Sequence, residues 1–190
     1  MIARTLLPLL AGWLSAACVL TGCQAPRAAS RQGLSAPSTR NNCYSLLHQL
    51  LNQQKDVSIL RFIKPEESDL KNLVNKIAAN SATGAKLLED FARHDPSIKL
   101  EDFRLPPGEA GTRVAIATTD EKELLGHTGK EFELALLLTQ TQALTYGWHL
   151  AKVAAENEPD PDRARALRGL SEDMQNLYHE AFVLLLSETK

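Results

Sequence analysis

The chain has 190 residues, a formal net charge of −2, and a composition of 44% hydrophobic, 23% charged and 5% aromatic residues. This composition is ordinary for a soluble globular protein, and the length suggests one folded domain. Domains that bind nucleic acids are usually basic, whereas this chain is near neutral and has no block of Lys or Arg. We therefore expect no nucleic-acid partner.

Residues 1–22 predict a secretory signal peptide. Arg4 is the only charged residue among them, and residues 5–20 are nearly all apolar or small. This run is shorter than the roughly 18–20 apolar residues that a membrane-spanning helix needs. We therefore interpret it as an exported leader.

The leader ends in Leu20-Thr21-Gly22-Cys23. This motif resembles the lipobox of bacterial lipoproteins, in which Leu, a small residue and Gly or Ala precede a Cys. The resemblance implies cleavage before Cys23, a diacylglycerol on its thiol and a further acyl chain such as palmitate on its amino group. Two or more acyl chains give stable anchoring, so the membrane is the first expected partner. An ordinary signal peptide followed by a chance Cys is the alternative.

The resemblance also implies a location in the cell envelope. Gln24 follows the Cys, where Asp would resemble the signal that retains lipoproteins in the inner membrane. In a bacterium with two membranes, the implied location is the outer membrane, with the protein facing the periplasm.

Residues 23–41 predict the lipidated Cys and a flexible tether, because they are rich in Ala, Ser, Pro and Gly. Arg27, Arg31 and Arg40 carry the only charges of the tether. They favour an anionic lipid surface or are simply solvated. Cys43 is the only thiol left free after processing, which excludes an intramolecular disulfide. We interpret it as a small apolar residue in the first turn of a helix.

The region from 42 to 188 predicts an all-α domain, because apolar residues recur there at helical spacing. Asn42 is a good N-cap for a first helix that ends at Ile63-Lys64-Pro65. Leu46 and Leu50 lie on its apolar stripe, which we consider a candidate docking face. A second helix is expected from Pro65 to Asp95. Its apolar positions are spaced four and three residues apart: Leu70, Val74, Ile77, Ser81, Gly84, Leu88 and Phe91.

Two further helices follow a long connection at residues 96–118. A crossover that runs the length of a bundle, or a functional loop, would explain that length. The third helix is expected to start at Thr118, Thr119 or Asp120 and to continue to Asn157. Asp160 and Pro161 predict the start of the fourth. The domain is thus expected to be a four-helix bundle, with a ferritin-like crossover as one form.

No enzyme signature is found. The chain lacks a Glu-x-x-His pair, a Gly-x-Ser-x-Gly elbow, a glycine-rich phosphate loop and a Cys-x-x-Cys pair. We therefore expect a non-enzymatic protein without a cofactor. The candidate metal or small-ligand residues are His127, Glu131 and His149 on one face of the third helix, completed by His179. The alternative is a hydrated stripe on an otherwise buried helix.

Two other groups have a structural and a functional interpretation. The aromatic residues Phe132, Tyr146, Trp148 and Tyr178 are typical of a core, or face a ligand. Four carboxylates follow within seven residues: Glu156, Glu158, Asp160 and Asp162. We interpret them as a solvated turn with a helix cap, the alternative being a loose Ca²⁺ site.

The segment Gly129-x-x-Phe132, followed by Gln142 and His149, is similar in kind to the predicted ferritin-like outer-membrane proteins of unknown function. This resemblance implies a bundle over about residues 65–187 without a metal centre, and it adds no activity. The sequence thus predicts a membrane-anchored periplasmic lipoprotein whose domain binds an envelope protein or assists envelope assembly. The alternative is a ferritin-like bundle that binds a metal or small ligand.

Overall fold

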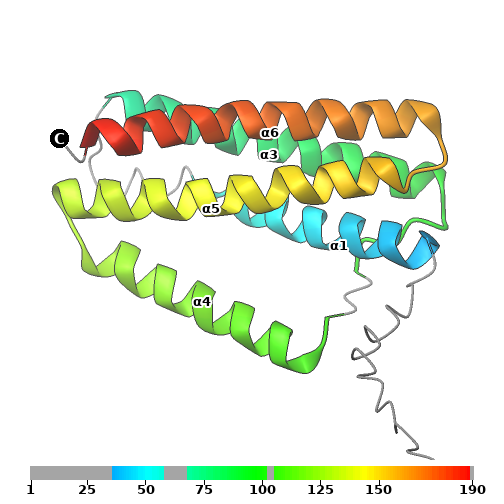
Figure 1. The fold of residues 1–190 in the computed structure, drawn as a ribbon, viewed down its shortest axis with the longest axis horizontal. Coiled ribbons are helices and arrows are strands. Elements are labelled where there is room, and N and C mark those ends of the chain that lie inside the picture. The colour runs from blue at the N-terminus through cyan, green and yellow to red at the C-terminus, as the bar shows by residue number, and fades with distance from the viewer. Residues whose placement is uncertain (1–35, 58–67, 102–104, 189–190) are drawn as a thin grey trace, which may run out of the picture. The chain divides into compact units, whose positions relative to one another are not determined.

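The computed structural model describes residues 36–57, 68–101 and 105–188, which belong to the compact unit Leu34–Lys190. The predicted signal peptide, Cys23 and the predicted tether up to residue 35 lie outside the described residues. Five α-helices and no strand occur in the described ranges (Figure 1). They are α1 (Ala36–Gln54), α3 (Ser68–His94), α4 (Pro107–Gly126), α5 (Gly129–Glu156) and α6 (Pro161–Glu188). The all-α prediction is confirmed, but the count of four helices is not.

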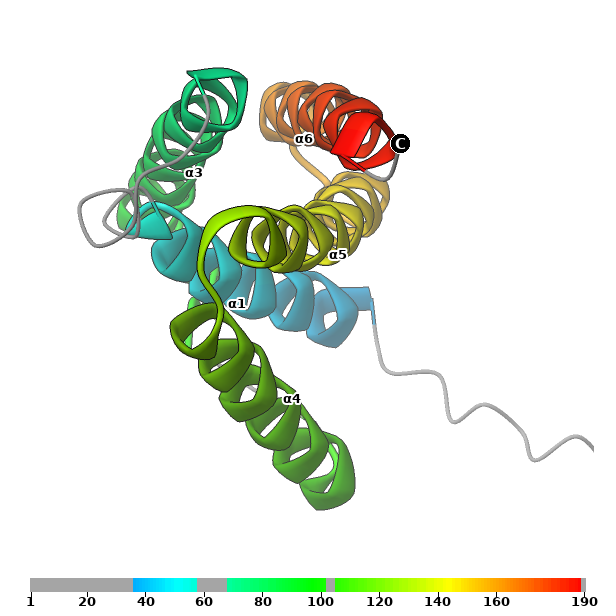
Figure 2. The ribbon, with the colours of Figure 1, turned by 90° about the vertical axis from the view of Figure 1, so that its left-hand side faces the viewer.

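Four of the helices surround a common core. The pairs α1 and α3, α3 and α6, α5 and α6, and α1 and α5 pack against one another, and Figure 2 shows them around one axis. α4 packs against α5 and diverges from the other helices (Figure 2). The largest fully buried side chains include Tyr44, Leu47, Leu51, Leu73, Ile77, Leu88, Phe132, Leu136, Leu137, Leu144, Leu167 and Met174.

The connection between α3 and α5 is a crossover, and most of it is helical. α3 and α5 run in the same direction, and α4, which comes between them in the sequence, runs in the opposite direction (Figure 1). The 20 residues of α4 give a helix of about 30 Å, shorter than the roughly 42 Å of α5 and α6. For the long connection at residues 96–118 the sequence left a crossover and a functional loop open, and residues 107–118 lie in α4, within the crossover. Pro107 stands at the first helical position, where proline is favourable, and starts that helix.

The predicted third helix is in fact two helices. α4 ends at Gly126, His127 and Thr128 have extended backbone, and Gly129 takes a positive φ of 57°. The expected start at Thr118, Thr119 or Asp120 is wrong, because all three residues lie inside α4. The hydroxyls of Thr118 and Thr119 donate to backbone carbonyls four residues earlier. The two extended residues and the positive φ of Gly129, which favours glycine, turn the chain from α4 into α5.

The second and fourth helices are confirmed as α3 and α6, and the expected start of the second at Pro65 lies outside the described residues. Gly84, in the middle of α3, faces both α1 and α6. A Cβ there would meet Leu170 Cδ1 at 3.0 Å and Leu51 Cδ1 at 3.1 Å. At the start of α6, Asp160 Oδ1 accepts the backbone N–H groups of Asp162 and Arg163, both at 2.9 Å. This is the predicted N-cap.

α1 begins at Ala36, within the range predicted for the tether. Arg40 is buried and its Nη2 donates to Ser97 Oγ at 2.8 Å, so it is part of the fold rather than a solvated tether charge. Asn41 Nδ2 donates to the Ser97 carbonyl at 3.1 Å. These partners are 56 and 57 positions away. Local composition therefore gives no sign of them.

Candidate functional site

The four residues predicted to hold a metal or small ligand do not form one cluster. Glu131 and His149 share α5 but are 18 residues apart, which places them roughly 27 Å apart along the axis. His127 lies in the α4–α5 junction, and His179 lies on α6. Among the described residues, no group of three or more His, Cys, Asp or Glu side chains is arranged to hold a metal ion.

His149 and His179 instead lie beside Trp148, at the outer edge between α5 and α6. The His149 and His179 rings are 5.1 and 6.3 Å from the Trp148 ring, and both histidines are exposed. Tyr178 packs edge-on against Trp148 at 5.1 Å and stacks on Phe182 at 5.9 Å. Of the four aromatic residues considered in the sequence, only Phe132 is fully buried. The other three form the margin of the core.

A shallow groove of about 540 Å³ follows these aromatic residues along α5 and α6. Its lining carries no Asp, Glu, Lys or Arg and consists of Leu138, Thr141, Gln142, Thr145, Tyr146, His149, Tyr178, Phe182 and Leu185. The hydroxyls of Thr141 and Thr145 donate to carbonyls of their own helix, so they are not free to orient a ligand. The groove is therefore mostly apolar, and Gln142 and His149 are exposed polar side chains in its lining.

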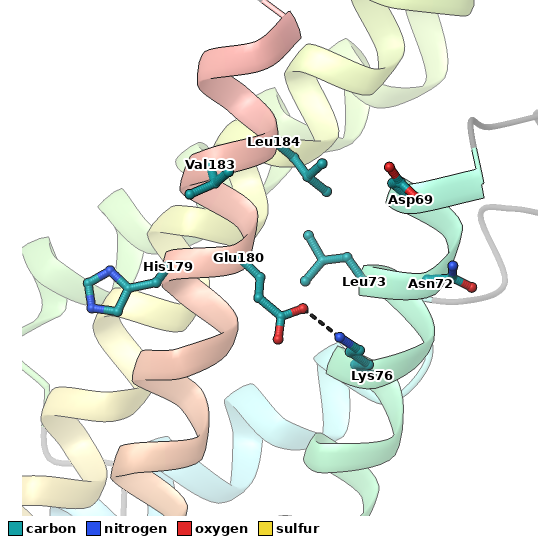
Figure 3. Close-up of a pocket in the computed structure, with 8 residues that line it drawn as sticks. All are labelled: Asp69, Asn72, Leu73, Lys76, His179, Glu180, Val183 and Leu184. Carbon is teal, nitrogen blue, oxygen red and sulfur yellow. Dashed lines mark hydrogen bonds and ion pairs between the residues drawn. The ribbon is translucent and has the colours of Figure 1, made fainter.

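A second groove, of about 500 Å³, separates α3 from α6 (Figure 3). Lys76 Nζ and Glu180 Oε2 form an exposed ion pair of 2.7 Å across it. Leu73 and Leu184 face each other farther along the groove, whereas His179 points away from α3 (Figure 3). A surface pair of this kind contributes little to stability and arranges no reactive group.

The densest polar arrangement lies where the α5–α6 turn meets the start of α1 and the end of α3. We call it the Glu158 cluster, and it consists of Arg40, Tyr44, Asp95, Glu158 and Arg163. The Glu158 side chain has no solvent exposure. Its Oε2 accepts the Tyr44 hydroxyl at 2.6 Å, and its Oε1 accepts Arg163 Nη2 at 2.8 Å. Arg163 also reaches Asp95 at 3.1 Å, and Arg40 Nη1 lies 3.9 Å from Glu158.

Charge and burial shift the pKa values of this cluster in opposite directions. Burial raises the pKa of Glu158, but hydrogen bonds from Arg163 and Tyr44 outweigh it and leave the pKa below its usual value. Burial, reinforced by the bond to Glu158, raises the pKa of Tyr44. Glu158 is thus held ionised and Tyr44 neutral. The charges of the cluster join the start of α1, the end of α3 and the α5–α6 turn. The interpretation of Glu158 as part of a solvated turn is therefore wrong, because its side chain is buried.

α4 exposes three large apolar side chains, as α6 does with Phe182, Val183 and Leu186. Val114, Ile116 and Leu125 are 69%, 52% and 55% exposed. α4 is fixed to α5 through Arg113, whose Nη1 donates to the Tyr146 hydroxyl at 2.6 Å and whose guanidinium lies 4.6 Å from the Tyr146 ring centre.

Between α4 and α1 lies a cleft of about 290 Å³, which we call the α1–α4 cleft. Leu46 and Leu50 of α1 and Val114 and Ile116 of α4 are among its lining residues. Leu46 and Leu50 belong to the stripe that the sequence indicated as a docking face. The structure therefore places α4 beside that stripe.

None of the described helices is long and apolar enough to cross a membrane. No family model, curated protein or solved structure matches this chain.

Sequence reasoning missed the Glu158 cluster and the exposure of α4. The cluster joins residues up to 118 positions apart, so no local pattern reports it. For α4 a signal was present, because Pro107 begins a helix and Gly126 and Gly129 flank its end. The apolar residues of α4 and α5 are close enough in sequence to resemble one continuous helix.

Proposed function

We propose that this protein is a lipid-anchored lipoprotein of the cell envelope that binds another protein without catalysing a reaction. The anchor is the lipid on Cys23, and the contact surface is α4 together with the α1–α4 cleft. The observation that carries the proposal is the position of α4, which leaves Val114, Ile116 and Leu125 in solvent. Val114 and Leu125 lie on one side of α4, because 11 residues make about three turns, and Ile116 lies on another side. Large apolar side chains exposed in this way are candidates for burial by a partner.

The start of α1 supports the anchored arrangement. A protein held through Cys23 transmits any load on its tether to the N-terminal part of α1. In that part, Arg40, Asn41 and Tyr44 bond to Ser97 and Glu158. These long-range bonds fix the entry point of the tether to the rest of the fold.

The lipobox resemblance supports attachment, and a labelling experiment tests it. The full chain is produced in a bacterium that is fed a labelled palmitate analogue. We expect label in the wild-type protein and none in the Cys23→Ser variant. Cys18→Ser is the matched control, since Cys18 is removed with the signal, and it keeps the label. An unlabelled wild-type protein overturns the anchor.

A photoreactive amino acid at Val114 tests the contact surface in the same cells. Illumination is expected to give covalent adducts to another polypeptide. The control position is Lys71, which is exposed on α3, away from the proposed contact surface, and gives none. The absence of any adduct at Val114 overturns this surface.

A further inference from the structure

The α1–α4 cleft lies between two helix faces of the same kind. Residues at positions i, i+3, i+4 and i+7 share one side of a helix, and apolar residues at this spacing are typical of a side that packs against a neighbour. Both helices present a set with this spacing to the cleft. The set of α1 is Leu46, Gln49, Leu50 and Gln53, and the set of α4 is Arg113, Ile116, Ala117 and Asp120. The two walls of the cleft thus have the residue spacing of a packed helix pair.

The two sets also complement each other chemically. Each combines two apolar side chains with two polar ones. The small side chain of Ala117 allows another helix to come close, and Ile116 beside it can cover the leucines of α1. The two glutamines of α1 carry amides that both donate and accept, so they suit the guanidinium as well as the carboxylate of the α4 set. The walls can therefore pack on each other without a third molecule between them.

In this structure the two walls are not joined. Among the described residues that line the cleft, no hydrogen bond or ion pair links α1 to α4, and the cleft holds about 290 Å³. The bond of Arg113 runs to Tyr146 of α5 instead. Ile116 is 52% exposed although it lines the same cleft as the leucines of α1. Packed interiors have few voids larger than a water molecule, so a gap with apolar side chains on both walls favours closure.

The α4–α5 junction has the form of a hinge for this closure. α4 ends at Gly126, two extended residues follow, and Gly129 takes a positive φ of 57°. Hinge motions place their changes in φ and ψ in a few residues at the ends of elements. Figure 1 shows that α4 diverges from α5 with distance from this junction. A turn about the junction therefore moves α4 as a rigid helix and changes the width of the cleft.

We infer that α4 is a lid that turns about the α4–α5 junction and closes its face onto α1. This structure shows the open form. The inference rests on the proposed contact surface, because the closed lid covers the part of that surface that lies in the cleft. A partner that inserts into the cleft binds only the open form and shifts the population toward it. The lid thus controls access to the contact surface.

Disulfide trapping in the full chain tests the closure. Two thiols form a disulfide only when their Cα atoms come within about 7 Å. Ile116→Cys is combined with Gln49→Cys or with Gln53→Cys, one helical turn farther along α1, in a Cys43→Ala background. After a mild oxidant is added to the cells, we expect a disulfide within one chain in at least one of the two variants. Ala115→Cys, on the opposite side of α4, replaces Ile116→Cys in the control and should form none.

The outcomes of this trapping are distinct. A disulfide in neither variant, or an equal yield in the control, overturns the lid. Disulfides that join two chains, in place of a bond within one chain, overturn it as well. In each case the contact surface stands or falls separately, by the adducts at Val114.

A matched pair of charged variants shows whether the two faces meet. Ala117→Glu places a carboxylate in the closed interface, so the disulfide yield should fall at least about tenfold, equivalent to about 1.4 kcal/mol. Ala115→Glu introduces the same charge at a position that is likewise exposed in the open form, and it should leave the yield unchanged. Unchanged helical content shows that both variants fold. Equal yields in the two variants overturn the face-to-face closure.

The trapped chain shows whether the lid controls binding. With a photoreactive residue at Val114, the oxidised chain should lose most of its adducts to other polypeptides and regain them after reduction. Adducts that persist in the oxidised chain overturn the control of access, but not the contact surface. A chain that forms the disulfide yet gives no adduct even after reduction overturns the contact surface and with it the role of the lid, while the movement itself stands.

Discussion

The Tyr44 hydroxyl donates to Glu158 Oε2 at 2.6 Å, across 114 positions of sequence, and both side chains are buried. This bond joins the first turns of α1 to the turn between α5 and α6. Arg163 completes the arrangement by donating to the other oxygen of the same carboxylate at 2.8 Å. The N-terminal part of the folded chain is thus fixed to the α5–α6 turn by one ionised group.

Removal of either partner should destabilise the fold. Glu158→Gln leaves the guanidinium groups of Arg163 and Arg40 without their shared carboxylate, and we expect a loss of about 3 kcal/mol in the free energy of unfolding. Tyr44→Phe removes one hydrogen bond to a charged group and should cost about 2 kcal/mol. Urea unfolding followed by circular dichroism measures both.

The double variant and a control separate the cluster from general effects. Because the two residues share one bond, the costs of Tyr44→Phe and Glu158→Gln should sum to more than the cost of the double variant, by about 1 kcal/mol. Glu156→Gln, at an exposed position two residues earlier, should change stability by less than about 0.5 kcal/mol. Additive costs would show that the bond contributes nothing of its own.

The same cluster predicts how stability depends on acid. The pKa values of Glu158 and Asp95 lie below their usual values of 4.5 and 3.8, Asp95 chiefly because Ser97 donates to it. A lowered pKa in the folded state gives stability that is present above the usual value and is lost as pH falls through the folded value. Unfolding free energy should therefore decline below about pH 4.5. In the Glu158→Gln variant this decline should be shallower than in the wild type. Equal slopes in the two proteins would show that Glu158 does not contribute to the decline.

Local sequence signals predict part of this structure well. The Asp160-Pro161 start of α6 and the four-three spacing of α3 are decided by neighbouring residues, so both helices lie where the sequence indicates. Arg40 was assigned to the tether because its partners, Ser97 and Glu158, are distant in sequence. A helical wheel grouped Glu131 with His149, but a wheel ignores the rise along the axis that separates them.

The thiol of Cys43 should be unreactive in the folded protein. It is buried, and burial raises its pKa from 9.0 to about 11. Because the thiolate is the reactive form, a shift of this size should slow its reaction with a thiol reagent at pH 8 roughly hundredfold, relative to the protein unfolded in urea. Equal rates in the two states would show that Cys43 is exposed.

Because the pKa of Cys43 is raised, the stability of the fold should also decrease at alkaline pH. A raised pKa gives stability that is fully present below the usual value and is lost as pH rises through the folded value. We expect the unfolding free energy to decline between pH 9 and about 11. The Cys43→Ala variant should lose part of this decline. We assign the rest of the decline to Tyr44, because burial also raises the pKa of its hydroxyl.

Gly84 should be required for the close packing of α3 against α1 and α6. A Cβ at this position lies 3.0 Å from Leu170 Cδ1 and 3.1 Å from Leu51 Cδ1, so a longer side chain must displace both helices. We expect Gly84→Leu to lower the free energy of unfolding by about 3 kcal/mol, at the upper end of overpacking costs. Gly169→Leu is the matched control, because a Cβ at Gly169 in α6 meets nothing within 4 Å.

The control should be neutral or more stable than wild type by up to about 1 kcal/mol, since leucine has the higher helix propensity. Thermal and urea unfolding of the two variants measure the difference directly. Equal stability of the Gly84 and Gly169 variants would mean that the three helices can separate at no cost, and the small residues in the centre of α3 would then have no packing role.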